Sequence, residues 1–187
     1  MPASLLRLIT ACLAGDQAAI TQLVERYRSQ VFGLCFRMLG HRQDAEDVTQ
    51  ETFLRVLNNL NQWDQQRPFE PWLFAIASNR CRTALAKRAR RPHLDSLVET
   101  TSTADARQQA RNALDEELNL ALNHLRPEHR LAFTLFHHHE KSYLEIAEIL
   151  NCPLGTAKTW VHRARRSLLH RLHTREVISE THHHAMP

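Results

Sequence analysis

Apolar residues recur at helical spacing along most of the chain, in segments separated by short polar or proline-containing stretches. The longest segment runs from Ala18 to Leu39 and is followed by Gly40, a residue suited to a helix C-terminus. A second amphipathic helix is expected to begin at Asp44, and a third at Trp72 after a loop over residues 61–71. Because there is little alternating pattern, the chain is predicted to be all-α.

The residues from Ser142 to Arg166 predict two short helices joined by a tight turn. Ser142 and Glu145 form a capping box, in which each side chain satisfies the other's free backbone N–H. Asn151 suits the end of the first helix, and Pro153 suits the first turn of the second. The second helix is expected to bury one stripe of small and apolar residues: Ala157, Val161, Ala164 and Leu168. This pattern predicts a helix-turn-helix.

Between the two groups of helices, the apolar period is lost and serine and threonine become frequent. This composition is typical of a flexible linker. After it, Pro127 is expected to begin a helix that runs through Phe136 and leads into the helix-turn-helix. We therefore expect two small helical domains joined by a flexible linker, with these bounds: first domain 1–91, linker 92–111, second domain 112–175 and disordered tail 176–187.

The distribution of charge is more informative than the net charge of +4 or the pI near 9.2. Every charged residue from 157 to 175 is Lys or Arg, and the same holds from 79 to 91. A merely solvated surface usually mixes charges of both signs. Both stretches therefore favour contact with a polyanion such as DNA. The alternative for the helix-turn-helix is an ordinary helical hairpin with a solvated, charged face.

The helix expected to begin at Asp44 has an acidic face opposite its apolar face. Asp44, Asp47 and Glu51 fall on that side by helical geometry. Acidic residues near a helix N-terminus complement the helix dipole, which explains Asp44 and Asp47 structurally. Glu51 lies two turns into the helix, where this explanation is weak.

Aromatic residues lie beside the basic stretch at 79–91. Rings can stack on exposed bases while cations contact phosphates, so this combination suits single-stranded nucleic acid. The alternative is that the rings belong to the hydrophobic core. That alternative is preferred for Phe69 and Phe74, and both interpretations stay open for Trp72.

The sequence offers no pattern typical of catalysis. A phosphate-binding glycine loop, a nucleophile elbow and a paired-carboxylate cleft are all missing, so no enzymatic activity and no cofactor are expected. The histidines at 137–139 should point to different sides of a helix, so no metal site is expected. The cysteines form no CxxC pair and are expected to be packed, reduced thiols in the cytosol: Cys12, Cys35, Cys81 and Cys152.

The chain is also expected to act in the cytoplasm. No apolar run approaches the roughly 20 residues that a membrane span needs. The brief apolar run at the start of the chain, MPASLLRLITACLAGD, makes a signal peptide an alternative there. Because Asp16 and an amphipathic helix follow directly, the start is interpreted as mature protein.

Taken together, these motifs resemble the bacterial extracytoplasmic-function (ECF) sigma factors, the smallest members of the sigma-70 family. Two segments resemble region 2 of that family: DAEDVTQETFLRV (Asp44–Val56) and PFEPWLFAIASNRCRTAL (Pro68–Leu85). Two later segments resemble region 4: LRPEHRLAFTL (Leu125–Leu135) and SYLEIAEILNCPLGTAKTWVHRAR (Ser142–Arg165). The resemblance covers about residues 16–172, and the DAED-Q-ETF element upstream of a PWL helix is its most specific part.

The resemblance implies a partner for each surface. Four residues would form the face that docks on core RNA polymerase, at the clamp helices of its largest subunit: Asp44, Asp47, Gln50 and Glu51. The residues that open and hold the minus-10 element of promoter DNA would be Trp63, Trp72, Asn79, Arg80, Thr83 and Lys87. The minus-35 element would be read in the major groove by Lys158, Thr159, His162, Arg163, Arg165 and Arg166. An anti-sigma factor is a further implied partner.

The chain departs from the family pattern at several positions. Family members usually carry an acid where Thr83 stands, commonly have Arg at the position of Trp160, and have a Gly-containing turn in place of residues 137–141. The promoter sequence therefore cannot be inferred from relatives. Two other functions are alternatives: a helix-turn-helix repressor or activator that acts without polymerase, and a metal- or stress-sensing adaptor.

Overall fold

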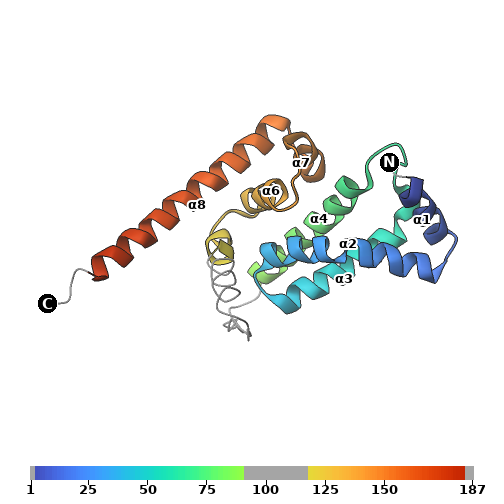
Figure 1. Cartoon of the computed structure of the whole chain (residues 1–187), viewed down its shortest axis with the longest axis horizontal. Coiled ribbons are helices and arrows are strands. Elements are labelled where there is room, and N and C mark those ends of the chain that lie inside the picture. The colour runs from blue at the N-terminus through green and yellow to red at the C-terminus, as the bar shows by residue number, and fades with distance from the viewer. Residues whose placement is uncertain (1–2, 91–117, 184–187) are drawn as a thin grey trace.

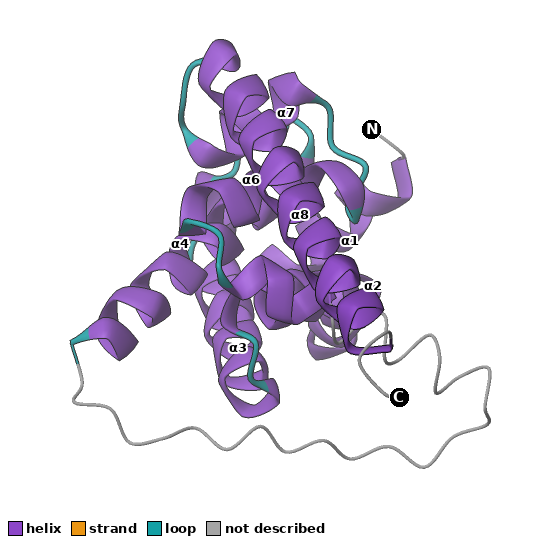
Figure 2. Cartoon of the chain, turned by 90° about the vertical axis from the view of Figure 1, so that its left-hand side faces the viewer, coloured by secondary structure: helices purple, strands orange, loops and turns teal. Residues whose placement is uncertain are grey.

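The computed structural model describes residues 3–90 and 118–183, and within these residues every regular element is a helix (Figures 1 and 2). The prediction of an all-α fold is confirmed. The helices are α1 (Ala3–Leu13), α2 (Gln17–Leu39), α3 (Arg42–Asn58), the short 3-10 helix η1 (Leu60–Gln62), α4 (Phe69–Ala89), α6 (Pro127–His137), α7 (Tyr143–Leu150) and α8 (Leu154–His183). Residues 118–123 are also helical. The predicted linker, 92–111, lies outside the described residues.

Helices α1–α4 form the N-terminal module, in which α2, α3 and α4 pack against one another and α1 packs against α2. Asp16 caps α2, because its Oδ1 accepts a hydrogen bond from the backbone N–H of Ala18 at 2.9 Å. Gly40 ends α2 in the left-handed conformation, with φ of 71°. That conformation favours glycine, so the end of this helix was predictable from the sequence.

Helix α4 begins at Phe69, three residues before the predicted start at Trp72. The prediction failed because Pro71 was interpreted as part of the loop. Pro71 in fact lies in the first turn of α4, where backbone N–H groups have no helical partner and a missing N–H costs nothing. Similarly, α8 continues to His183, into the residues expected to form the tail.

The C-terminal module contains α6, α7 and α8, and its helix-turn-helix matches the sequence pattern closely. The capping box at the start of α7 is present: the Glu145 carboxylate accepts from the Ser142 backbone N–H at 2.8 Å, and the Ser142 Oγ accepts from the Glu145 N–H. Asn151 ends α7 in the left-handed conformation, with φ of 50°. Residues of the predicted stripe on α8 are all buried: Ala157, Val161, Ala164 and Leu168.

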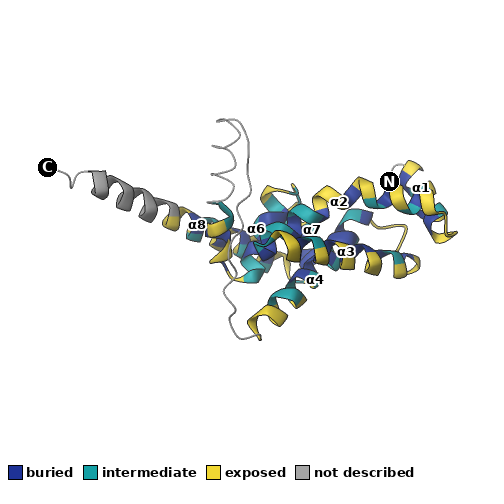
Figure 3. Cartoon of the chain, turned by 90° about the horizontal axis from the view of Figure 1, so that it is seen from below, coloured by how far each residue is buried: buried dark blue, intermediate teal, exposed yellow. Residues whose placement is uncertain are grey.

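The two modules pack against each other, which the sequence pattern did not indicate. Helix α7 lies along α4, and α6 lies across α2 (Figure 1). Buried residues line the helix faces where α6 and α7 meet the N-terminal module (Figure 3). Among the described residues, no helix is long and apolar enough to cross a membrane.

Candidate functional site

The acidic residues predicted on α3 lie together on an exposed face. Asp44, Asp47, Gln50 and Glu51 are all exposed, while Val48, Thr52 and Phe53 on the other side are buried in the N-terminal module. Leu54, one turn beyond Gln50, is 63% exposed although it is a large apolar residue. We call the exposed set the α3 surface: Asp44, Asp47, Gln50, Glu51 and Leu54. An apolar side chain among acids and an amide is a composition suited to contact with a basic protein surface.

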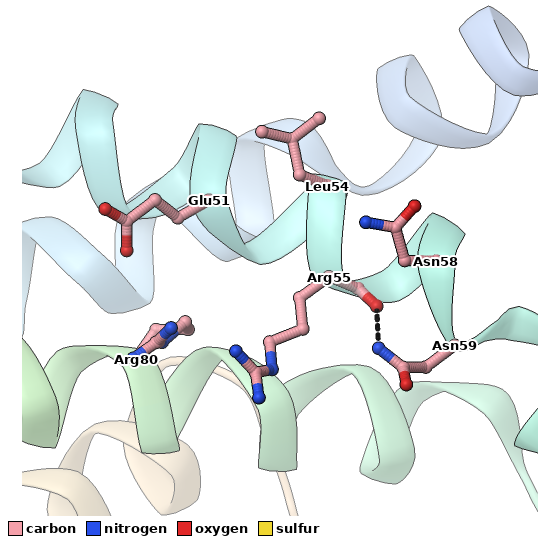
Figure 4. Close-up of a pocket in the computed structure, with 6 residues that line it drawn as sticks. All are labelled: Glu51, Leu54, Arg55, Asn58, Asn59 and Arg80. Atoms are coloured by element: carbon pink, nitrogen blue, oxygen red, sulfur yellow. Dashed lines mark hydrogen bonds between the residues drawn. The ribbon is translucent and has the colours of Figure 1, made fainter.

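An open hollow of about 350 Å³ lies between the end of the α3 surface and α4, and residues of both helices line it. Figure 4 shows Arg55 of α3 and Arg80 of α4 converging on it, with Glu51 on the α3 side. The Asn59 amide is fixed at one edge, because its Nδ2 donates to the Arg55 carbonyl oxygen at 2.7 Å. The remaining lining residues are Leu54 and Asn58. The hollow therefore connects the α3 surface with the basic face of α4.

The basic face of α4 presents polar residues at helical spacing. Asn79, Thr83 and Lys87 are exposed, and Arg80 is half-buried. The Asn79 side chain is held in place, since its Oδ1 accepts from Arg82 Nη2 at 2.6 Å. The Thr83 hydroxyl donates to the Asn79 backbone carbonyl at 2.9 Å. A face with cations and an oriented amide can contact phosphates and one base edge.

The predicted aromatic contacts with DNA need one correction. Trp63 is 5% exposed and packs edge-on against Phe69, with ring centroids 5.4 Å apart. Its ring has no free face in this arrangement, so it supports the surface from behind instead of stacking on a base. Phe69 and Phe74 are buried, as preferred from the sequence. Trp72 is half-buried and contacts Phe69 at a centroid distance of 5.6 Å, so part of its ring remains accessible.

Helix α8 carries the residues predicted to read duplex DNA. Five of the six predicted residues are exposed on the side opposite the buried stripe: Lys158, Thr159, His162, Arg163 and Arg166. Arg165 is half-buried and directed toward α6, because its Nε donates to His137 Nε2 at 3.0 Å. Its guanidinium also lies 5.2 Å from the centre of the Phe136 ring. Trp160 is half-buried and packs against the core.

The histidines at 137–139 have different surroundings. His137 accepts from Arg165, and burial together with that neighbouring cation lowers the pKa of His137. His139 is half-buried, and its ring packs against the Phe74 ring, with centroids 4.7 Å apart. In the part of the chain that the structure describes, no three potential metal ligands converge.

All four cysteines are free thiols, as the sequence predicted. Cys35 of α2 and Cys81 of α4 are buried, with their Sγ atoms 3.7 Å apart. The contact with the Cys35 thiol, reinforced by burial, raises the pKa of Cys81 well above its ordinary value. A thiol of this kind is protonated at neutral pH and serves the packing of α2 against α4.

The fold and these surfaces define an all-helical protein of the helix-turn-helix class. Comparison with known proteins is more specific: models of "Sigma-70 region 2" and "Sigma-70, region 4" match residues 23–91 and 115–168. The chain is 35% identical to the ECF RNA polymerase sigma factor SigW of Bacillus subtilis, over 82% of this chain and 89% of that protein. It is 32% identical to the ECF RNA polymerase sigma-E factor of Haemophilus influenzae, over 82% of this chain and 87% of that protein.

The solved structure of CnrH in complex with the cytosolic domain of CnrY is similar to that of this chain, with a TM-score of 0.68 and 27% sequence identity. The similarity covers 89% of this chain and 96% of that one. The chain belongs to the ECF RNA polymerase sigma factors of the sigma-70 family.

Proposed function

We propose that this sigma factor brings core RNA polymerase to a specific set of promoters and helps to open them, without catalysing a reaction and without a cofactor. The observation that carries this proposal is the position of the α3 surface beside the basic face of α4, within one unit in which α2, α3 and α4 pack against one another. A protein that docks polymerase through α3 would hold the melted strand on α4, next to the enzyme. Run-off transcription with purified core polymerase tests this function.

Each surface has a separate proposed partner. The α3 surface docks on the clamp helices of the largest polymerase subunit, through Asp44, Asp47, Gln50 and Glu51. The minus-10 element is held on α4 by Trp72, Asn79, Arg80, Thr83 and Lys87. The minus-35 element is bound by the exposed face of α8. These roles divide the chain at the predicted bounds, into a region 2 domain (1–91), a linker (92–111) and a region 4 domain (112–175).

Promoter opening follows from binding energy and not from covalent chemistry. Unstacking one base costs a few kcal/mol, and stacking that base on an aromatic ring while contacting its phosphate recovers roughly 1–3 kcal/mol. The accessible part of Trp72 supplies the ring, and the Asn79 amide, oriented by Arg82, supplies a hydrogen-bonding edge. The single-stranded state of the promoter is thereby stabilised relative to the duplex.

We further propose that an anti-sigma factor regulates this chain in the cytoplasm. The support is that CnrH, which resembles this chain over most of its length, was solved in complex with the cytosolic domain of CnrY. Titrating a purified candidate anti-sigma domain into the sigma–core mixture should displace the sigma factor from polymerase.

The residues on α8 should divide into two functional groups along the helix. A helix in the major groove reads bases mainly through its N-terminal residues, whereas later turns lie against phosphates. We expect Lys158→Ala and His162→Ala to change which minus-35 bases are preferred, by roughly 1–3 kcal/mol at one position. Arg166→Ala should weaken binding to all sequences alike and reduce the salt dependence by about one counterion.

The measurement is a panel of minus-35 base substitutions, bound to each variant at two salt concentrations. Arg171→Ala is the matched control, because Arg171 is an exposed arginine farther along α8, beyond the residues proposed to contact DNA. If base preference is identical in the Lys158, Thr159 and His162 variants and in the wild type, α8 does not read the minus-35 element.

A further inference from the structure

Two cysteines from different helices meet in the core of the N-terminal module. Cys35 of α2 and Cys81 of α4 have their Sγ atoms 3.7 Å apart, and neither side chain is exposed to solvent. No other atom fits between the two sulfurs at this distance. Cys12 of α1 and Cys152 of the turn between α7 and α8 lie elsewhere in the fold. The packing of α2 on α4 therefore brings one particular pair of thiols within reach of each other.

The two thiols of this pair differ in how readily they ionise. The Cys81 thiol, which is the donor in the contact, lowers the pKa of Cys35, although burial acts in the opposite direction. The same contact, together with burial, raises the pKa of Cys81 well above its ordinary value. Since the thiolate is the nucleophile and the thiol is not, Cys35 is the sulfur that attacks an oxidant first. Cys81 keeps its proton and is placed to react second.

We propose that Cys35 and Cys81 are a redox-modification site, which hydrogen peroxide converts into a disulfide between α2 and α4, and that this disulfide weakens the hold of α4 on the melted promoter strand. The second part rests on the proposed function. Both sulfurs are buried, so the oxidant has to be small. Hydrogen peroxide reaches them when α4 separates locally and briefly from α2, as packed helices do in native proteins.

The reaction consumes hydrogen peroxide in two steps. In the first step, the Cys35 thiolate attacks a peroxide oxygen, the S–O bond forms and the O–O bond breaks. The departing hydroxide takes up the proton that Cys35 had released and leaves as water. In the second step, the Cys81 sulfur attacks the Cys35 sulfenic acid, the S–S bond forms, the S–O bond breaks, and the Cys81 proton joins the departing hydroxide to give water. The two thiols are oxidised by two electrons, and the peroxide is reduced to water.

Formation of the disulfide displaces the basic face of α4. A disulfide holds its sulfurs about 2.05 Å apart, so the two Sγ atoms must approach each other by about 1.7 Å. Asn79 and Thr83 are exposed and lie two positions before and after Cys81, and successive residues of a helix are about 100° apart. Both residues therefore lie on the side of α4 opposite the thiol. Movement of Cys81 toward α2 withdraws this side from the minus-10 strand.

Disulfide formation is tested on the purified full chain, without DNA or polymerase. The protein is treated with hydrogen peroxide, its remaining thiols are blocked with N-ethylmaleimide in denaturant, and linked peptides are identified by mass spectrometry without reduction. We expect an intramolecular link between Cys35 and Cys81, which dithiothreitol removes. The matched control Cys12→Ala/Cys152→Ala should form the same link. Reduced Cys35 and Cys81 after oxidation of the other cysteines, or links only between separate chains, would overturn the proposal.

The order of the two steps is tested by removing one sulfur at a time. Cys81→Ala should stop at the sulfenic acid of Cys35, which dimedone traps as an adduct detectable by mass spectrometry. Cys35→Ala should give little adduct at Cys81, because the remaining thiol has no donor to stabilise its thiolate. Thermal melting shows whether both variants fold. Equal adduct formation at Cys81 in Cys35→Ala would show that the assigned order is wrong.

The effect on promoter opening is measured with sigma factor that is oxidised before it meets core polymerase. The peroxide is removed first, so that the enzyme itself is not exposed to it. Open complexes detected with permanganate should decrease by about fivefold or more, the lower end of what the loss of one base stack costs. Co-purification with core polymerase should be unchanged, and dithiothreitol should restore opening. Cys35→Ala should open the promoter equally with and without prior peroxide treatment.

Three outcomes would contradict different parts of this inference. A link between Cys35 and Cys81 with unchanged opening would overturn the proposed effect on α4. A loss of opening that dithiothreitol does not reverse would assign the loss to irreversible oxidation and overturn the role of the disulfide. Failure of the untreated, reduced protein to start transcription would overturn the proposed function and with it the effect on opening, while mass spectrometry alone decides whether the disulfide forms.

Discussion

Reversing the charges of Asp47 and Glu51 together is expected to abolish co-purification with core polymerase while leaving the melting temperature nearly unchanged. Both side chains are exposed on α3, opposite the buried face of that helix. Exposed substitutions of this kind usually change the free energy of unfolding by no more than about 0.5 kcal/mol each. In a docking interface, however, two like charges placed opposite a basic partner cost several kcal/mol, which is enough to remove binding.

The matched control for this variant is Glu25→Arg, which reverses one exposed acid on α2 outside the α3 surface. Binding should fall strongly in Glu51→Arg and Asp47→Arg and remain normal in Glu25→Arg. Leu54→Ala should weaken binding as well, because it removes the exposed apolar side chain at the end of the surface. If the double reversal still binds core polymerase normally, the α3 surface is not the docking site.

Removing the accessible ring and the oriented amide on α4 should reduce promoter opening more than initial recruitment. Trp72→Ala and Asn79→Ala each delete a contact that forms only with the separated strand. The loss of one base stack is worth roughly 1–3 kcal/mol, or about 5- to 150-fold in open-complex formation. Permanganate footprinting of open complexes measures this effect, and co-purification with core polymerase measures recruitment.

Trp72→Phe distinguishes the stacking role from a structural one. The variant retains a ring against Phe69 and should keep most of the opening activity, whereas Trp72→Ala should lose it at an unchanged melting temperature. Asn79 is exposed, so its replacement does not disturb the core. If Trp72→Ala unfolds the N-terminal module, the alternative interpretation of Trp72 as a core residue is correct.

Those parts of the fold that depend on local sequence could be predicted. The capping box of Ser142 and Glu145, the left-handed ends at Gly40 and Asn151, and the stripe on α8 all follow from residues a few positions apart. Such signals act within one helix or one turn, where the backbone hydrogen bonds and side-chain periodicity are fixed by chemistry. The exposed acids on α3 were predictable for the same reason.

Interactions between distant segments could not be predicted in the same way. Periodicity marks Leu131 and Leu135 as buried but does not say that they pack on the other module. Arg130 looks like a surface cation in the sequence, yet it is 5% exposed and caps α2 from α6. The pattern around Trp63 is equally compatible with a core residue and a base-stacking residue, because both uses need an aromatic ring.

The most direct test of the account is run-off transcription with purified core polymerase and a library of promoter fragments. We expect the core enzyme alone, and the sigma factor alone, to give no specific transcript, and the two together to start at defined positions. Substituting the Asp47→Arg/Glu51→Arg variant should abolish those transcripts, whereas Glu25→Arg should retain them. Specific binding of this protein to promoter duplex without polymerase, together with no stimulation of the core enzyme, would contradict the account and identify a conventional helix-turn-helix regulator.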